Sequence, residues 1–292
     1  MSTEDSATWR YIQNITGFLA RPEVHINYDG ETAKNYRPNG INFEINYSNL
    51  YTNFISEKGE LDLVYMIDST GSMGGWILGV TNKCKEILDK LINDNPKLKN
   101  YEIKCGGVFY RDPVDKPGDI NEYQSLGDVS SLKLRLESIS KNATGGGDTP
   151  EDWVGAYKIV LNNDIMKWRE NSIKIIIHIA DAGAHSLRFS EGDEKHNSIE
   201  SEQELENLIQ NCAKKNITIF GLQITDTPKK SFTECEKIYN KVKSTDSEYK
   251  ISKFDDLKDE NIIAEKLKEN VANSISAFIN KKKIKKLKLK NK

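Results

Sequence analysis

One short segment most constrains how this chain can fold. An apolar run at 61–67 ends abruptly in Asp68-Ser69-Thr70-Gly71-Ser72-Met73-Gly74. An unbroken run of Leu, Val, Tyr, Met and Ile is typical of a strand buried on both faces of a parallel sheet. A helical pattern resumes near Trp76. Asp68 is therefore predicted at the carboxyl end of a strand, where open α/β sheets place their ligand sites.

Three oxygen-bearing side chains alternate along this segment: Asp68, Thr70 and Ser72. Alternate residues of an extended turn share a face, so the three are predicted to point the same way. Carboxylate and hydroxyl oxygens suit Mg²⁺ or Mn²⁺ better than zinc, and Ca²⁺ also takes oxygen ligands. Asp68 alone could form a turn and Ser72 alone could cap a helix. We favour a divalent metal site because the three occur together.

Strand and helix patterns alternate from Leu61 onward. Apolar runs predict further strands at 101–110, 173–180, 216–223 and 248–253, with an edge strand near 120–126. Helical spacing predicts helices at 75–93, 129–140, 150–168, 200–215, 231–243 and 256–280. This order predicts the α/β class, with a doubly wound, mostly parallel central sheet flanked by helices. The strands at 61–67 and 173–180 are the most apolar, so we expect them side by side at its centre.

The two ends of the chain differ from this pattern. Residues 1–58 are rich in Asn, Tyr and Thr, and we interpret them as an irregular N-terminal extension with one hairpin. The α/β domain is expected at 60–280, followed by a basic tail at 281–292. The last fourteen residues hold eight lysines and no acid, which leaves the rest of the chain at −10.

Charge and composition exclude several classes of protein. An acidic body argues against a specific nucleic-acid-binding domain. The tail Lys281–Lys292 could contact an anionic surface weakly, although a solvated terminus is the preferred interpretation. The chain opens on acidic and polar residues rather than on a signal peptide, and no apolar run approaches the roughly 18 residues of a membrane span. The four cysteines are widely spaced, so we expect buried thiols in a cytoplasmic protein.

Two further segments echo the first. A glycine-rich loop, Gly145-Gly-Gly-Asp148-Thr149-Pro150-Glu151-Asp152, opens a predicted helix. Asp181 follows the apolar strand at 173–180 as Asp68 follows the first strand. Adjacent strands would bring these two carboxylates together, and a divalent cation would relieve the cost of burying them.

Together these segments resemble the metal-ion-dependent adhesion site of von Willebrand factor type A (VWA) domains. The likeness is strongest to the A domains that accompany atypical alpha-kinases in protists, which also have a Tyr-Arg-Asp block, here Tyr110-Arg111-Asp112. It covers residues 60–280 and implies a Rossmann-like VWA fold. It also implies that Mg²⁺, Mn²⁺ or Ca²⁺ is bound, and that an acidic residue of another protein completes the metal shell. The metal-binding positions it implies are Asp68, Thr70, Ser72, Asp148, Thr149 and Asp181.

The chain departs from the family pattern at two of these positions. Thr70 stands where Ser is commonest, and its hydroxyl can serve equally. Asp148 falls where the second loop usually supplies Thr, with Thr149 one residue later. Either residue could reach the ion, and a third carboxylate would reduce the need for a partner's acid. Thr149 and Pro150 also fit a helix start, with Thr as the capping residue.

Three functions compete at the sequence level. The preferred one is a non-catalytic, metal-dependent protein-binding module. The second is a kinase-associated scaffold. No kinase catalytic block is visible after residue 190, so we do not expect kinase activity in this chain itself. The third is a metal-dependent phosphohydrolase with Asp68 as its nucleophile, but Thr70 stands where such enzymes need a second acid. No Gly-Lys-Ser/Thr follows the glycine-rich loop and no Gly-x-Ser-x-Gly elbow occurs, so a P-loop and an α/β-hydrolase site are excluded.

Overall fold

The computed structural model divides the chain into two units, Met1–Lys58 and Gly59–Lys292. It describes residues 25–28, 32–36 and 42–46 of the first unit, and much of 59–253 in the second. Within the second unit it does not describe residues 80–81, 83, 87–88, 90–100, 114–119, 140, 142–148, 194–197 and 245–246. The predicted helix at 256–280 and the lysine tail lie outside the described residues.

The first unit contains a small antiparallel sheet. Its strands are β1 (His25–Tyr28), β2 (Thr32–Tyr36) and β3 (Asn42–Asn46), and β2 pairs with both neighbours. The sequence predicted one hairpin here, and the alternation at 41–45 matches β3. The structure has one strand more than a hairpin. The sequence did not reveal it, because β1 and β2 are too short and polar to give a clear pattern of alternation.

The second unit contains a six-stranded sheet in the order β6-β5-β4-β7-β8-β9. All neighbours are parallel except the antiparallel edge strand β6. The bounds are β4 (Gly59–Asp68), β5 (Tyr101–Tyr110), β6 (Glu122–Gly127), β7 (Ile173–Ala180), β8 (Ile217–Gln223) and β9 (Tyr249–Lys253). The two most apolar strands, β4 and β7, are adjacent at the centre, as the sequence predicted.

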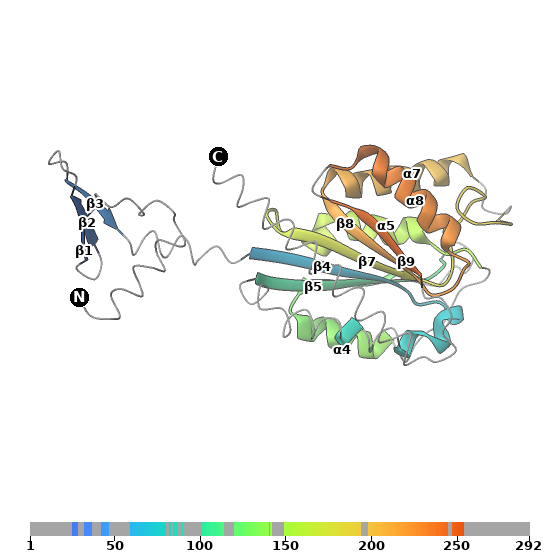
Figure 1. Ribbon diagram of the computed structural model, residues 1–292. Coiled ribbons are helices and arrows are strands. Elements are labelled where there is room, and N and C mark those ends of the chain that lie inside the picture. The colour runs from blue at the N-terminus through green and yellow to red at the C-terminus, as the bar shows by residue number, and fades with distance from the viewer. Residues whose placement is uncertain are drawn as a thin grey trace. The chain divides into compact units, whose positions relative to one another are not determined.

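Helices cover both faces of this sheet (Figure 1). Helix α4 (Val129–Ile139) lies on one face, while α5 (Trp153–Leu161), α7 (Ile199–Lys214) and α8 (Lys229–Val242) lie on the other. The strands divide their side chains between the two faces, as a pleated strand must. Leu63 and Tyr65 join the α4 side of the core, and Val64 and Met66 join the other. The predicted α/β architecture is confirmed.

Two helical segments differ from their predictions. After β4 the chain first makes a 3₁₀ turn, Gly71–Gly75, before α-helix begins at Ile77. The helix predicted at 150–168 is two helices, α5 and the short α6 (Asn163–Met166). The Asn162 side chain accepts a hydrogen bond from the Asp164 amide (3.0 Å) and so starts a new helix inside an otherwise helical pattern.

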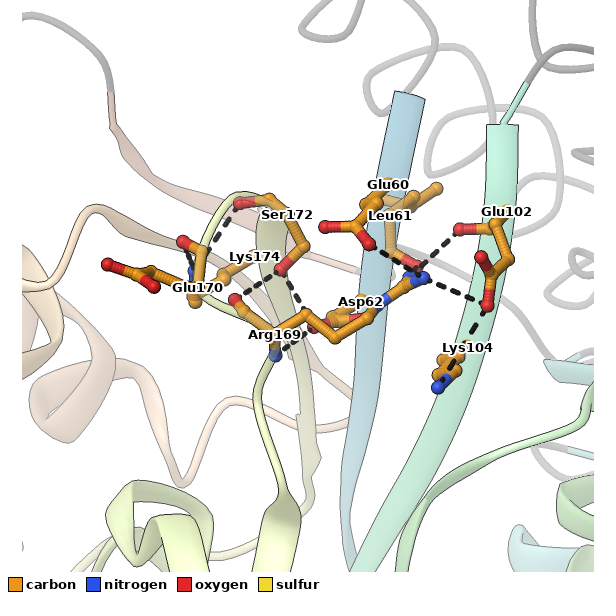
Figure 2. A network of polar contacts seen from close by, with 9 residues as sticks. All are labelled: Glu60, Leu61, Asp62, Glu102, Lys104, Arg169, Glu170, Ser172 and Lys174. Atoms are coloured by element: carbon orange, nitrogen blue, oxygen red, sulfur yellow. Dashed lines mark hydrogen bonds and ion pairs between the residues drawn. The ribbon is translucent and has the colours of Figure 1, made fainter. Parts of the chain in front are cut away.

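A polar network closes the amino-terminal end of the sheet (Figure 2). Asp62 of β4 is fully buried. Its Oδ1 accepts a hydrogen bond from Arg169 Nε (2.8 Å), and its Oδ2 accepts from the Arg169 amide (2.8 Å) and from Ser172 Oγ (2.7 Å). Arg169 also donates to the carbonyl of Glu102 on β5 (2.9 Å). Both oxygens of this carboxylate are therefore paired, and Arg169 matches its charge.

The remaining sequence expectations concern cysteines and membrane spans. Cys84, Cys105, Cys212 and Cys235 are buried and form no disulfide, as predicted. Among the described residues, none of the helices has the length and apolar character that crossing a bilayer requires.

Candidate metal centre

The adjacency of β4 and β7 brings two carboxylates to one edge of the sheet. Ile67 and Ile179 are paired residues of the two parallel strands, and each strand runs out at the same edge. Asp68 is the last residue of β4, and Asp181 follows the last residue of β7. The sequence thus predicted correctly that both strands deliver an acid to the same place.

A chain of hydrogen bonds connects four of the six predicted metal-binding residues. Asp68 Oδ1 accepts from the amide of Thr70 (3.0 Å) and from its Oγ1 (2.7 Å). Thr70 Oγ1 lies 3.1 Å from Ser72 Oγ, which donates to Asp181 Oδ1 (3.2 Å). Ser72 thus points across to β7 rather than capping the turn that contains it. The alternating residues share a face, as their spacing predicted.

Backbone contacts hold the two acidic loops in place. The amide and hydroxyl of Ser69 both donate to the carbonyl of Tyr110 at the end of β5 (2.9 and 2.8 Å). Thr225 Oγ1 donates to the carbonyl of Asp181 (2.6 Å). The loop after β4 is thus fixed to β5, and the loop after β7 is fixed to the segment that follows β8.

His185 links the same edge to a neighbouring loop. Its Nε2 lies 3.1 Å from Oδ1 of the buried Asp112, which follows β5. Its Nδ1 lies 3.3 Å from Oδ2 of Asp193, which also accepts from the Ser186 amide (2.5 Å). The segment after Asp181 is therefore folded back and held against the end of β5.

The carboxylates of this site are buried without a matching positive charge. Asp68 is fully buried, and its Oδ2 has no hydrogen-bond partner. Burial, together with repulsion from Asp181, raises the pKa of Asp68 to about 8. Burial also raises the pKa of Asp181. A raised pKa means that burial disfavours the ionised form of these acids, and a cation bound between them would stabilise that form.

The structure adds Glu151, which the sequence analysis did not propose as a site residue. Its amide donates to the carbonyl of Gly183 (2.8 Å), and it pairs with Ala184 in an isolated parallel bridge. Glu151 is 2% exposed, and its Oε2 has no hydrogen-bond partner. Burial first, and then repulsion from Asp68, raises the pKa of Glu151 to about 10. The only sequence signal was its place in the Pro-Glu-Asp block.

The two remaining predicted residues are Asp148 and Thr149. Asp148 lies outside the described residues. Thr149 is exposed, and it does not cap helix α5 as its sequence context suggested. Asp152 is the cap instead: its Oδ1 accepts from the Gly155 amide (2.7 Å), and its Oδ2 accepts from Asn121 (2.8 Å). A carboxylate caps a helix at least as well as a hydroxyl, and helix α5 therefore begins three residues later than a Thr149 cap would place it.

This arrangement suits a hard divalent cation. Two carboxylates and two hydroxyls converge, and oxygen ligands of this kind are those that Mg²⁺ and Ca²⁺ prefer. The part of the chain that the structure describes contains no group of three or more His, Cys, Asp or Glu side chains already arranged to hold a metal ion. The donor set is therefore mixed, with neutral hydroxyls between the acids.

Comparison with known proteins finds partial relatives. No family model matches the chain. An alpha-protein kinase of Dictyostelium discoideum, vwkA, is 30% identical over 131 residues, which cover 44% of this chain and 19% of that protein. A putative ariadne-like RING finger protein, R811, of Acanthamoeba polyphaga mimivirus is 30% identical over 132 residues, covering 45% of this chain and 12% of that protein. The chain therefore matches under a fifth of the length of either relative.

Two solved structures of the pilus adhesin SpaC from Lactobacillus rhamnosus GG have a similar fold. The open conformation matches with a TM-score of 0.51 and 15% identity, over 75% of this chain and 30% of the adhesin. A second form of the adhesin matches with the same score and identity, over 87% of this chain and 34% of the adhesin. At this identity the likeness concerns the fold alone. The comparisons together show an α/β fold with partial similarity to a protist alpha-kinase protein.

Proposed function

We propose that this chain is a divalent-metal-dependent protein-binding module with a VWA-type metal site, and that it is not an enzyme. The observation that carries the proposal is Asp68 Oδ2, which is fully buried beside Asp181 and has no partner. Asp68, Thr70, Ser72 and Asp181 would hold Mg²⁺, or Mn²⁺ or Ca²⁺ in its place. Asp148 and Thr149 remain predicted ligands from the second loop.

The donor set favours binding through a partner's acid. Thr70 and Ser72 contribute neutral oxygens, so these four side chains bring only two negative charges to a divalent ion. The ion is therefore not over-neutralised, and a carboxylate of another protein can still bind to it. Mg²⁺ also keeps several exchangeable water ligands when proteins bind it. An Asp or Glu of a partner protein could replace one of these waters, with the ion bridging the two proteins.

A two-stage experiment tests the proposal. Mn²⁺ binding to the full chain is measured by electron paramagnetic resonance, comparing wild type with Asp68→Asn and with the matched control Asp62→Asn. Asp62 is buried on the same strand, but Arg169 pairs with it, so Asp62→Asn is expected to keep the Mn²⁺ site. Partner capture with Mg²⁺ and with chelator follows. Loss of Mn²⁺ binding in Asp68→Asn, and loss of capture in chelator, would support the proposal.

A kinase-associated role is the second candidate. The partial similarity to the alpha-protein kinase vwkA favours it. The match covers only 19% of vwkA, so the similarity supports a part that accompanies a kinase rather than a whole kinase. In this proposal the module would recruit or position a separate kinase rather than phosphorylate anything itself. Mixing the purified chain with an alpha-kinase catalytic domain, and finding no Mg²⁺-dependent association, would argue against it.

The phosphohydrolase alternative has less support. A nucleophilic Asp68 would need an acid nearby at the position of Thr70, and the Thr70 hydroxyl instead donates to Asp68 Oδ1. That hydrogen bond lowers the nucleophilicity of the carboxylate. We expect no turnover of p-nitrophenyl phosphate with Mg²⁺, and turnover that Asp68→Asn abolishes would reverse this order of preference.

A further inference from the structure

Asp112 ends the Tyr110-Arg111-Asp112 block, which the proposed metal site leaves without a role. It is fully buried just after β5, and its Oδ1 lies 3.1 Å from His185 Nε2. The other ring nitrogen, Nδ1, lies 3.3 Å from Oδ2 of the buried Asp193. The side chain of His185 is itself 10% exposed. One imidazole ring therefore lies between two buried carboxylates that come from different segments of the chain.

The two contacts favour a ring with a proton on each nitrogen. An ionised carboxylate only accepts hydrogen bonds, and a neutral imidazole has one N–H to donate, whereas an imidazolium has two. Asp193 Oδ2 already serves as an acceptor, because the Ser186 amide donates to it (2.5 Å). A neutral ring would turn a lone pair toward one of the two carboxylates. An imidazolium donates to both and places a positive charge between the two buried acids.

The position of His185 connects this pair of contacts to the metal site. His185 stands four residues after Asp181 in the loop that follows β7. The next residue, Ser186, is buried with a φ of 92°, a left-handed conformation that residues with a side chain disfavour. Its amide donates to Asp193 and its hydroxyl to Glu202 (both 2.5 Å), and these bonds hold it there. The direction in which the chain leaves Asp181 thus depends on the contacts of His185 and Ser186.

We propose that His185 is a doubly protonated bridge between Asp112 and Asp193, and that this bridge positions the loop of Asp181 for the divalent ion. The second half of the inference rests on the proposed metal-dependent function. His185 is a positioning residue, since it acts on the site through the loop and is not among the proposed ligands. The acids around the bridge are Asp112 after β5, Asp193 before α7, and Glu202 within α7, which holds the neighbouring Ser186.

Nitrogen NMR of the full chain with labelled histidine tests the bridge directly. The spectrum is recorded in chelator at about pH 7.5, where an unperturbed histidine with a pKa of about 6.5 is mostly neutral. The chain has four histidines, and the signals that are lost in His185→Gln belong to His185. Nitrogen chemical shifts distinguish a protonated ring nitrogen from an unprotonated one, and both nitrogens of His185 are expected to be protonated. A ring with one unprotonated nitrogen would overturn the bridge.

Mn²⁺ affinity then tests the positioning role. His185→Gln removes the charge, and Asp112→Asn is the milder change, because it keeps the shape of that side chain. Both are expected to weaken Mn²⁺ binding by about tenfold, as loss of a group that orients metal ligands does. Lys230→Ala is the control, since the exposed Lys230 donates to the Leu187 carbonyl of the same loop (2.6 Å), and it should stay within about twofold of wild type. Melting temperatures in chelator show that each variant is folded.

Failure of this inference is distinct from failure of the proposed function. If wild type binds Mn²⁺ and both His185→Gln and Asp112→Asn bind it equally well, the positioning role is wrong and the proposed function stands. If wild type binds no Mn²⁺ at all, the proposed function fails and the positioning role fails with it. The NMR spectrum still decides in that case whether His185 bridges the two acids as an imidazolium.

Discussion

The two ends of strand β4 bury the same side chain in opposite electrostatic settings. Asp62 and Asp68 are both fully buried and stand six residues apart, about 20 Å along the strand. Asp62 has Arg169 and Ser172 on its two oxygens. Asp68 has only hydroxyl and amide donors on one oxygen, nothing on the other, and a second acid beside it.

The same helical connection produces both settings. Glu151 precedes helix α5 at the carboxyl edge of the sheet, and Arg169 follows α6 at the amino edge. One end of the connection therefore places Glu151 near Asp68, and the other places Arg169 against Asp62. Asp62 is thus compensated by a basic side chain of the chain itself, while Asp68, in the function that we propose, takes its cation from solution.

The largest effect on stability is expected from removing the Arg169 guanidinium, which pairs with Asp62. Arg169→Ala would leave Asp62 buried without its counter-charge, and breaking a buried pair in this way costs about 3–5 kcal/mol of unfolding free energy. Urea denaturation monitored by circular dichroism measures the change. Lys158→Ala is the matched control, because Lys158 pairs with Glu204 at the surface (2.8 Å), where such pairs contribute about 0–1 kcal/mol. Equal effects of the two substitutions would remove the distinction between the two ends.

An effect of opposite sign is expected at the other end. In chelator, Asp68→Asn removes a carboxylate that is buried and repelled, so the free energy of unfolding should rise by on the order of 1–3 kcal/mol. The same exchange at Asp62 should lower it, because Arg169 then loses its partner. Mg²⁺ should raise the melting temperature of wild type and leave that of Asp68→Asn unchanged. A loss of stability in metal-free Asp68→Asn would contradict the comparison.

The pH dependence of stability should reveal the uncompensated acids. The folded-state pKa of Asp68, about 8, and that of Glu151, about 10, lie above their ordinary values, so the folded protein binds more protons than the unfolded chain at neutral pH. Such groups contribute stability at low pH that is lost as the pH rises through the folded pKa. In chelator, stability should therefore fall by roughly 2 kcal/mol from about pH 7 to about pH 8, about 1 kcal/mol from each acid.

This window also avoids an opposing group. Burial lowers the pKa of His178, so its effect is a loss of stability on acidification below its ordinary pKa of about 6.5. Urea titrations in chelator and in Mg²⁺ measure both slopes. Mg²⁺ should flatten the loss, because the ion replaces the protons. Stability that rises with pH across this window in chelator would show that the pKa values of these acids are not raised in the folded protein.

The sequence predicted the fold well because the central strands are apolar on both faces. The runs at 101–110 and 173–180 match β5 and β7 residue for residue. It missed the break at Asn162, since Asn is tolerated within a helical pattern and only its side-chain hydrogen bond to Asp164 starts the new helix. It predicted one hairpin where β1, β2 and β3 form a three-stranded sheet, because β1 and β2 are only four and five residues long.

The site was predictable only where strand ends determine it. Asp68 and Asp181 follow apolar strands, so their convergence depended only on the order of β4 and β7. Glu151 reaches the cluster through a contact with Gly183, which no local pattern encodes. Arg169 pairs with Asp62 across 107 positions of sequence, so spacing could not reveal it either. Long-range contacts thus supplied the charges that distinguish the two ends.

The smallest expected effect concerns Thr149, the exposed residue of the predicted second loop. Thr149 makes no capping bond, because Asp152 caps helix α5. Thr149→Val should therefore change the unfolding free energy in chelator by less than about 0.5 kcal/mol, as surface substitutions usually do. Asp152→Ala should cost about 1 kcal/mol by comparison.

Metal affinity then decides whether Thr149 belongs to the site. As a ligand, Thr149 would make Thr149→Val weaken Mn²⁺ binding several-fold while stability in chelator stays level. Asp152→Ala has the reverse expectation, a loss of stability that appears with and without metal. If Thr149→Val binds Mn²⁺ as wild type does, the ligands at this edge come from residues that are buried, as Asp68 is, and the exposed hydroxyl is only part of the loop. The carboxyl end of β4 would then depend on buried acids alone for its cation, as the amino end depends on Arg169.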